Sequence, residues 1–210
     1  MAGTITLLEV QKRNKERVNV FLDGEYAFPV TIMVAAELKK GQFLSDAEIE
    51  QFKQQDQRNK AYNHAIFYLG FRARSRAEIE TYLRDKKYSA EVIGDTINRL
   101  NQEGYLNDKE FAQTWVQERE QFKPRSGRAL RYELRQKGVN DAVIEEVLAG
   151  LDEDSLAWQA IESKIRQWRR LEEADFKKKA LGFLSRRGFS YDIARQTVDR
   201  AWSELNEEPE

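Results

Sequence analysis

Three stretches of equal length repeat along the chain and decide its fold. Residues 79–97 read IETYLRDKKYSAEVIGDTI, residues 130–148 read LRYELRQKGVNDAVIEEVL, and residues 180–198 read ALGFLSRRGFSYDIARQTV. They align without a gap on Leu83, Leu134 and Leu184, which lie 51 and 50 positions apart. Apolar residues recur at helical spacing around each leucine, and a serine or asparagine suited to an N-cap stands six positions after it. Each stretch therefore predicts an amphipathic helix, a tight turn and a second amphipathic helix.

A further helical segment precedes each pair, so that each repeat has three predicted helices. The apolar positions of these segments are Ala65, Ile66 and Leu69, then Phe111, Ala112, Trp115 and Val116, then Leu156, Trp158, Ile161, Ile165 and Trp168. Capping boxes are predicted for Ser45 with Glu48, for Ser75 with Glu78, and for Asn107 with Glu110. A unit of ~50 residues buries more apolar surface when it stacks on its neighbours. We therefore expect an elongated, curved array.

A short β unit opens the chain. Residues 4–10 and 18–22 are rich in β-branched and apolar residues, and residues 26–30 alternate at the strand period. Asp23-Gly24 between the last two segments is typical of a type I′ hairpin turn. These segments predict a three-stranded meander, followed by a helix over residues 31–38.

The fold class is therefore mainly α, with three tandem helix-turn-helix-like repeats after a small β-meander. The expected boundaries are 1–58 for the N-terminal unit, 59–106 for the first repeat, 107–153 for the second, and 154–210 for the third repeat with an acidic tail. With 210 residues, the chain is long enough to bury a sizeable core.

The composition argues against most enzyme chemistry. The chain has no cysteine and one histidine, His64, so thiolate zinc sites and His-dependent triads lack their residues. No glycine-rich phosphate loop occurs, and no carboxylate pattern singles out an acid–base pair. We expect no catalysis, no cofactor and no metal. His64 is interpreted as a packing or surface residue.

The sequence also lacks the signals of export and membrane insertion. It shows neither a basic stretch followed by an apolar run at its start nor ~18 uninterrupted apolar residues. A cytoplasmic monomer without a membrane partner is the expectation.

Charge is balanced over the whole chain but clustered locally. There are 35 Lys and Arg against 36 Asp and Glu, which gives a net charge of −1. Residues 119–137 hold seven basic residues against two acidic ones. Arg128, Arg131 and Arg135, spaced by three and four, share one helix face, while Leu130 and Leu134 turn to the core. We expect these three side chains to be free to bind a phosphate backbone or a carboxylate-rich groove.

Comparable basic groups occur in the other repeats, and the acidic residues lie elsewhere. Asp141, Glu145, Glu146 and residues 152–154 form an acidic run, which predicts a molecule with two faces of opposite sign. The alternative is that these charged runs are only solvated helix faces. The four tryptophans and Tyr105 are interpreted as packing residues, with base stacking or partner contact as the alternatives.

Motifs across residues 60–205 resemble the RecX family of recombinase regulators. The first group is Leu69, Arg72, Arg74, Ser75, Glu78 and Leu83; the second is Gly104-Tyr105-Leu106-Asn107-Asp108 with Phe111-Ala112; the third is Arg119, Gly127, Leu130, Leu134 and Lys137-Gly138. Asn107, Ile79 and Lys87 depart from the family's usual aspartate, leucine and glycine, but suit the same cap, core and turn roles. The N-terminal extension is similar to that of some Gram-positive members.

The resemblance implies a non-enzymatic protein that binds the RecA–DNA filament and inhibits its ATP hydrolysis and strand exchange. It also implies weak binding to single-stranded DNA, with double-stranded DNA as a further partner. Two alternatives stay open: a stand-alone helical DNA-binding or architectural protein, and a scaffold that joins other proteins. The candidate binding residues are Arg72, Arg74, Arg76, Arg84, Lys86, Lys123, Arg125, Arg128, Arg131, Arg135, Lys137, Arg186 and Arg187.

Overall fold

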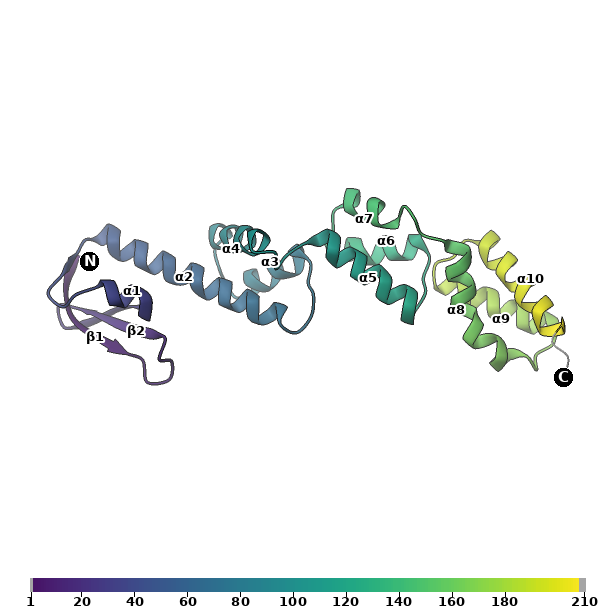
Figure 1. The fold of residues 1–210 in the computed structure, drawn as a ribbon, viewed down its shortest axis with the longest axis horizontal. Helices are drawn as coiled ribbons and strands as arrows, with labels where there is room; N and C mark the ends of the chain where they lie inside the picture. The colour runs from purple at the N-terminus through teal and green to yellow at the C-terminus, as the bar shows by residue number, and fades with distance from the viewer. Residues whose placement is uncertain (1, 208–210) are drawn as a thin grey trace. The chain divides into compact units, whose positions relative to one another are not determined.

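A computed structural model describes residues 2–207 and divides them into two compact units (Figure 1). Unit 1 comprises residues 1–72 and 79–105, and unit 2 comprises residues 73–78 and 106–210. The strands are β1 (Gly3–Val10), β2 (Arg17–Leu22), β3 (Glu25–Thr31) and β4 (Phe43–Leu44). The helices are α1 (Ile32–Glu37), α2 (Asp46–Leu69), α3 (Arg76–Asp85), α4 (Ala90–Gln102), α5 (Asp108–Phe122), α6 (Gly127–Gln136), α7 (Asp141–Leu148), α8 (Glu153–Trp168), α9 (Glu173–Arg186) and α10 (Tyr191–Glu207). In this part of the chain no helix combines the length and apolarity needed to cross a membrane.

The N-terminal sheet is antiparallel, with the strand order β3-β2-β1-β4. Asp23 and Gly24 both have positive φ, at 49° and 91°, which confirms the hairpin turn between β2 and β3. The prediction of three strands is incomplete, because β4 pairs with the first residues of β1. A two-residue strand is too short to show an alternating pattern.

One face of the sheet forms the core of the N-terminal unit. Ile5, Val20 and Phe28 are almost fully buried there, and Leu44 and Ile49 pack against them. An ion pair holds the sheet to α2, because Arg17 of β2 donates to the buried carboxylate of Asp56 over 2.6 Å. The helix α2 is continuous from residue 46 to residue 69 and so runs through the expected boundary at residue 58.

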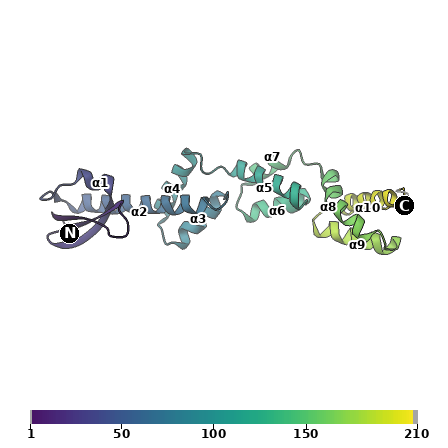
Figure 2. The same ribbon diagram turned by 60° about the horizontal axis from the view of Figure 1, so that its bottom comes forward.

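The three predicted repeats are present, each with three helices. They comprise the C-terminal half of α2 with α3 and α4, then α5 to α7, then α8 to α10. The aligned leucines Leu83, Leu134 and Leu184 are all fully buried. Within the third repeat, α9 and α10 lie side by side in both views of the ribbon (Figures 1 and 2). The mainly α fold class with a small β unit is confirmed, while the elongated, curved array stays a prediction.

The predicted helix caps and packing tryptophans are also found. Ser45 and Glu48 form a reciprocal capping box, and Ser75 and Glu78 bond each other's backbone N–H groups. Asn107 accepts from the N–H groups of residues 109 and 110. Trp168 lies in the core of the third repeat, and the other three tryptophans pack partly buried against cores of unit 2.

The turn inside each repeat depends on one residue in the left-handed conformation. Lys87, Gly138 and Gly188 occupy equivalent positions and have φ values of 67°, 72° and 94°. A left-handed conformation costs a residue with a Cβ about 1–2 kcal/mol. A lysine at the first of these positions therefore carries a conformational cost in the first repeat.

Unit 2 contains the same hydrogen-bonded contact twice. In each, a serine at the start of a helix donates to the carbonyl of the residue before a left-handed glycine, and we call this contact a joint. The hydroxyl of Ser75 donates to the carbonyl of Lys137, and at the equivalent place the N–H of Ser126 donates to the carbonyl of Arg187 over 3.2 Å. The first backbone N–H of the following helix is also capped from another helix. Arg76 N–H donates to Asp108 over 2.8 Å, and Gly127 N–H donates to Glu153 over 2.9 Å.

The joint leaves no room for a side chain at Gly138. A Cβ there would lie 2.3 Å from the Cβ of Ala77, in addition to the left-handed backbone. We expect Gly138→Ala to lower the free energy of unfolding of unit 2 by about 3 kcal/mol, from backbone strain and overpacking together. All four tryptophans belong to unit 2, so their fluorescence in a urea titration reports this unit.

The matched control is Gly150→Ala, where an added Cβ meets nothing within 4 Å and φ is not left-handed. This variant should unfold close to the wild type. Ala77→Gly combined with Gly138→Ala should lose less than the sum of the two single changes. An additive result would contradict the close contact.

Candidate nucleic-acid and partner interface

The arginine stripe, by which we mean Arg128, Arg131 and Arg135, lies on α6 of the second repeat. The helix begins after Ser126, whose hydroxyl oxygen accepts from the backbone N–H of residue 129 over 3.2 Å. Leu130 and Leu134 are fully buried, and Arg128 is exposed on the other side of the helix. The local fold of the stripe is therefore as predicted.

Two of its three arginines are engaged within the molecule. Arg131 donates to both carboxylate oxygens of Glu145 over 2.6 and 2.8 Å, and Arg135 donates to Asp141 over 2.6 Å. These hydrogen bonds hold the pKa of the Glu145 and Asp141 carboxyls below their ordinary values. The expectation of three free guanidinium groups is wrong for Arg131 and Arg135.

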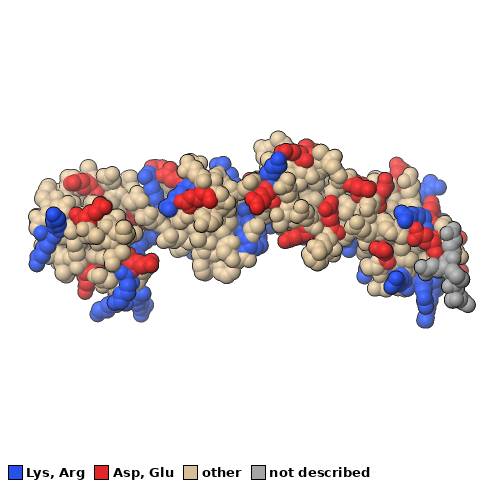
Figure 3. Space-filling view, in the orientation of Figure 1, with Lys and Arg blue, Asp and Glu red and all other residues tan. Residues whose placement is uncertain are grey.

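The acidic run after α6 is the reason. It forms α7, which packs against α6 and places its carboxylates beside the arginines. Glu146 pairs with Lys109 of α5 over 2.6 Å. On the face shown in Figure 3, basic and acidic side chains are interspersed over this repeat. The prediction of two faces of opposite sign is therefore wrong here, because runs that are separate in sequence meet in the helix pair.

Glu133 is a structural centre that the sequence analysis missed. Its side chain is only 15% exposed and accepts from Arg119 over 2.8 Å and from the indole N–H of Trp115 over 2.8 Å. Arg125 lies 2.9 Å from its other carboxylate oxygen. In the sequence, Glu133 is one of two acidic residues in a basic segment. Nothing in that pattern indicates that three side chains converge on it.

Two other candidate cations belong to the joints of unit 2. Lys137 pairs with Glu78 over 2.9 Å. Arg187 donates to the carbonyl of Pro124 over 2.9 Å, and burial lowers the pKa of its guanidinium. Both side chains therefore contribute to contacts within unit 2.

An exposed group remains at the end of α5 and along α6. Lys123 and Arg128 are exposed and have no carboxylate within 4 Å in residues 2–207. Phe122 and Tyr132 are 75% and 66% exposed, and Tyr132 follows Arg128 by one helical turn. We call these four residues the α5–α6 surface. Phe122 and Tyr132 were not predicted as binding residues, because an aromatic residue in a helical pattern does not show by itself whether it faces solvent.

The other candidates are distributed over the first and third repeats. Arg84 and Arg186 are exposed without a carboxylate within 4 Å in the described chain, and Lys86 lies 5.2 Å from the centre of the Tyr82 ring. Arg72 and Arg76 are exposed, while Arg74 is half-buried. Tyr105 is 56% exposed, so the expectation that it packs between helices is wrong.

The chemistry of the α5–α6 surface suits a polyanion. Exposed aromatic rings offer stacking faces for unpaired bases, and cations without internal partners are available for phosphates.

His64 is exposed and hydrogen-bonds the hydroxyl of Tyr88 over 2.9 Å. Among residues 2–207 no group of three or more His, Cys, Asp or Glu could hold a metal ion.

Four family models match the chain in sequence order. They are the regulatory protein RecX N-terminal domain at residues 3–45, and the RecX first, second and third three-helix domains at residues 61–100, 107–148 and 152–198. The three helical domains coincide with the three repeats.

Relatives and solved structures agree with these matches. The regulatory protein RecX of Bacillus subtilis is 36% identical over 98% of this chain and 80% of its own length. That of Listeria monocytogenes serotype 4b (strain F2365) is 33% identical over 96% and 77%. A crystal structure of regulatory protein RecX has a TM-score of 0.72 and 27% identity, covering 94% of this chain and 99% of that one. The structure of RecX from Lactobacillus salivarius gives 0.61 and 26%, covering 72% and 98%.

The role of Glu133 can be tested by removing its charge alone. We expect Glu133→Gln to lower the free energy of unfolding of unit 2 by about 1–3 kcal/mol, because two guanidinium groups lose a partially buried carboxylate. The measurement is urea denaturation followed by tryptophan fluorescence. The control Glu146→Gln breaks the exposed pair with Lys109 and should change stability little. Equal stability of the two variants would contradict the structural role.

Proposed function

The chain belongs to the RecX family of regulatory proteins, and on that premise we propose that it binds the filament formed by the RecA recombinase on DNA and inhibits it. The inhibited activities are ATP hydrolysis and strand exchange by the filament, in recombination and repair. The protein acts by binding and performs no chemistry itself.

The observation that carries the proposal is the match to all four family domains in order, from residue 3 to residue 198. Such coverage supports a shared role better than a match to one helical repeat, because three-helix units recur in many unrelated proteins. The residues that resemble the family's motifs lie in these same domains.

The ion pairs of the second repeat favour a filament over naked DNA as the target. Five of the seven basic residues in segment 119–137 have a carboxylate partner within the molecule, which leaves Lys123 and Arg128. Affinity for duplex DNA depends on the number of phosphates neutralised. With only two cations available in this segment and a net charge of −1 over the chain, binding of this segment to naked DNA should be weak. A filament adds protein surface to the contact.

The alternative is a stand-alone DNA-binding protein built from helix-turn-helix-like units. The α5–α6 surface supports this alternative to the extent that its aromatic and basic side chains suit nucleic acid. The two functions differ in whether the recombinase strengthens binding to DNA.

The first experiment measures RecA ATP hydrolysis on single-stranded DNA while this protein is titrated. We expect inhibition to be complete well below one regulator per recombinase subunit, because three repeats in one chain can contact several protomers or block a filament end. Inhibition that requires one regulator per subunit would contradict this mode. No inhibition, together with equal binding to DNA with and without RecA, would favour the stand-alone alternative.

The second experiment tests the α5–α6 surface with Lys123→Gln combined with Arg128→Gln. Loss of two charged contacts should raise the concentration for half-maximal inhibition at least tenfold, since 1.4 kcal/mol corresponds to about tenfold. Stability should change little, because neither side chain has an ion pair within the described residues. The charge-matched control is Lys39→Gln with Lys40→Gln, two exposed lysines of the N-terminal unit. Equal inhibition by both double variants would remove this surface from the site.

A further inference from the structure

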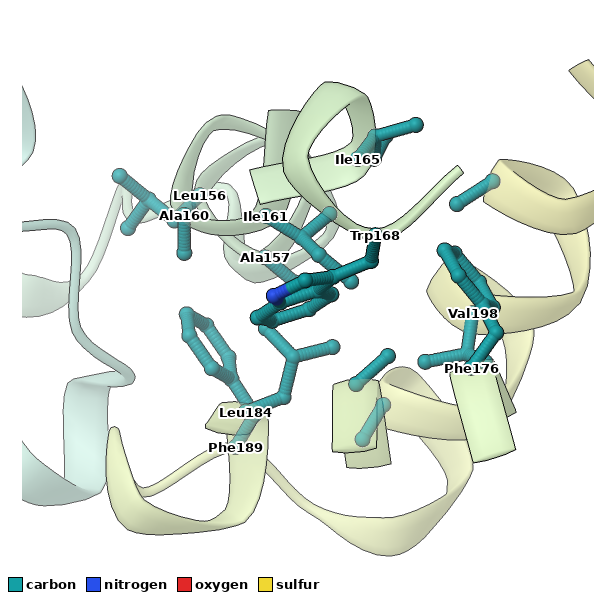
Figure 4. Close-up of a cluster of buried hydrophobic side chains, with 13 residues drawn as sticks. Leu156, Ala157, Ala160, Ile161, Ile165, Trp168, Phe176, Leu184, Phe189 and Val198 are labelled. Carbon is teal, nitrogen blue, oxygen red and sulfur yellow. The ribbon is translucent and has the colours of Figure 1, made fainter. Parts of the chain in front are cut away.

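The end of α8 in the third repeat carries a second group of three arginines. Ile165 and Trp168 of α8 lie in the core, where Trp168 contacts the ring of Phe176 edge to face (Figure 4). These two anchors fix the orientation of the last helical turn. Arg166 lies in the last turn of α8, Arg169 and Arg170 directly follow the helix, and all three are exposed.

These arginines converge on one cavity. A cavity of about 580 Å³ is lined by Arg166, Gln167, Arg169 and Arg170 of the α8 end and by Leu205 of α10. A smaller cavity of about 130 Å³ adjoins it, since Arg166 and Leu205 line both. The walls of the smaller cavity include Trp158 and Ile165, and also the carboxylates of Glu162 and Glu204. The site is thus cationic at one end and partly apolar at the other.

The charge of this group is not neutralised as it is on α6. Among the side chains of residues 2–206, none of the three guanidinium groups has a carboxylate within 4 Å or a side-chain hydrogen bond. Of the two acids on the adjoining walls, Glu204 pairs with Arg200 over 2.9 Å, and Glu162 makes no ion pair with these arginines. Three guanidinium groups that line one cavity and form no ion pair among the described residues repel one another. An anion in the cavity would relieve that repulsion.

We propose that the cavity at the end of α8 is a phosphate-binding site, with Arg166, Arg169 and Arg170 as its ligands. Guanidinium groups match phosphate oxygens in geometry, and two or more can share one phosphate. The wall of Trp158 and Ile165 would then contact the sugar or base attached to that phosphate. The phosphate belongs either to a single-stranded nucleic acid or to a free nucleotide. The first source rests on the proposed function, because the filament presents such a strand.

The experiment uses the full-length protein and no recombinase. Fluorescence anisotropy measures the binding of a fluorescein-labelled (dT)12 oligonucleotide, and ATP and inorganic phosphate are then added as competitors. The test variant is Arg166→Gln, Arg169→Gln and Arg170→Gln together. The charge-matched control is Lys39→Gln, Lys40→Gln and Lys53→Gln, three exposed lysines outside unit 2.

We expect the arginine variant to bind the oligonucleotide at least tenfold more weakly, with a salt dependence that falls by about two units of slope for three lost phosphate contacts. The lysine control should stay within twofold of the wild type. Both variants should show wild-type urea denaturation, which excludes unfolding as the cause. Equal affinity of the two triple variants would overturn the proposal.

A local measurement places the ligand. In the wild type, the indole N–H resonance of Trp158, assigned with Trp158→Phe, should shift on addition of the ligand that occupies the cavity. A shift with (dT)12 but not with millimolar ATP identifies a strand, and a shift with ATP identifies a nucleotide. No shift with either ligand or with phosphate would overturn the site. RecA inhibition is measured separately, so a protein that binds phosphate here but does not inhibit RecA would refute only the proposed function.

Discussion

The reversal of the backbone between the second and third helices is the constraint on which each repeat depends. In every repeat the helix ends with a left-handed residue, and the next N–H returns to the carbonyl of the buried leucine: Tyr88 to Leu83, Val139 to Leu134 and Phe189 to Leu184. This bonding closes the helix end and fixes the direction of the helix that follows. In the second and third repeats, the leucine side chain and the apolar residue after the turn enter the same core.

The same turn also builds the joints of unit 2. The carbonyls of Lys137 and Arg187, just before the left-handed glycines, accept from Ser75 and Ser126. Gly138 and Gly188 allow this approach because a Cβ at either position would collide with the neighbouring helix start. Glycine is therefore required at these turns for two reasons, conformation and space. In the first repeat, Lys87 occupies this position. Its backbone is also left-handed, so only the conformational reason for glycine applies there.

Pairing of charges distinguishes structural cations from cations that are available for binding. Most of the basic residues between α5 and the end of α6 are held by Glu78, Glu133, Asp141 or Glu145. The exposed pairs of Asp141 and Glu145 contribute little to stability, but they reduce the charge that a polyanion would meet. What remains is the α5–α6 surface and the arginine group at the end of α8. Both combine cations with an aromatic or apolar neighbour.

The sequence by itself determined the repeats, their helices, the caps, the hairpin turn and the family. These features depend on residues close together in the chain, and helical periodicity and turn chemistry report such local relations directly. The two-residue strand β4 and the continuity of α2 through residue 58 were not apparent from pattern alone. Only the tertiary structure decided which cations are free, because an ion pair such as Arg131 with Glu145 joins residues of two packed helices. A run of like charges in the sequence shows only which charges one element carries. The electrostatic interaction of a side chain depends on its distance in space to the charges of every other element.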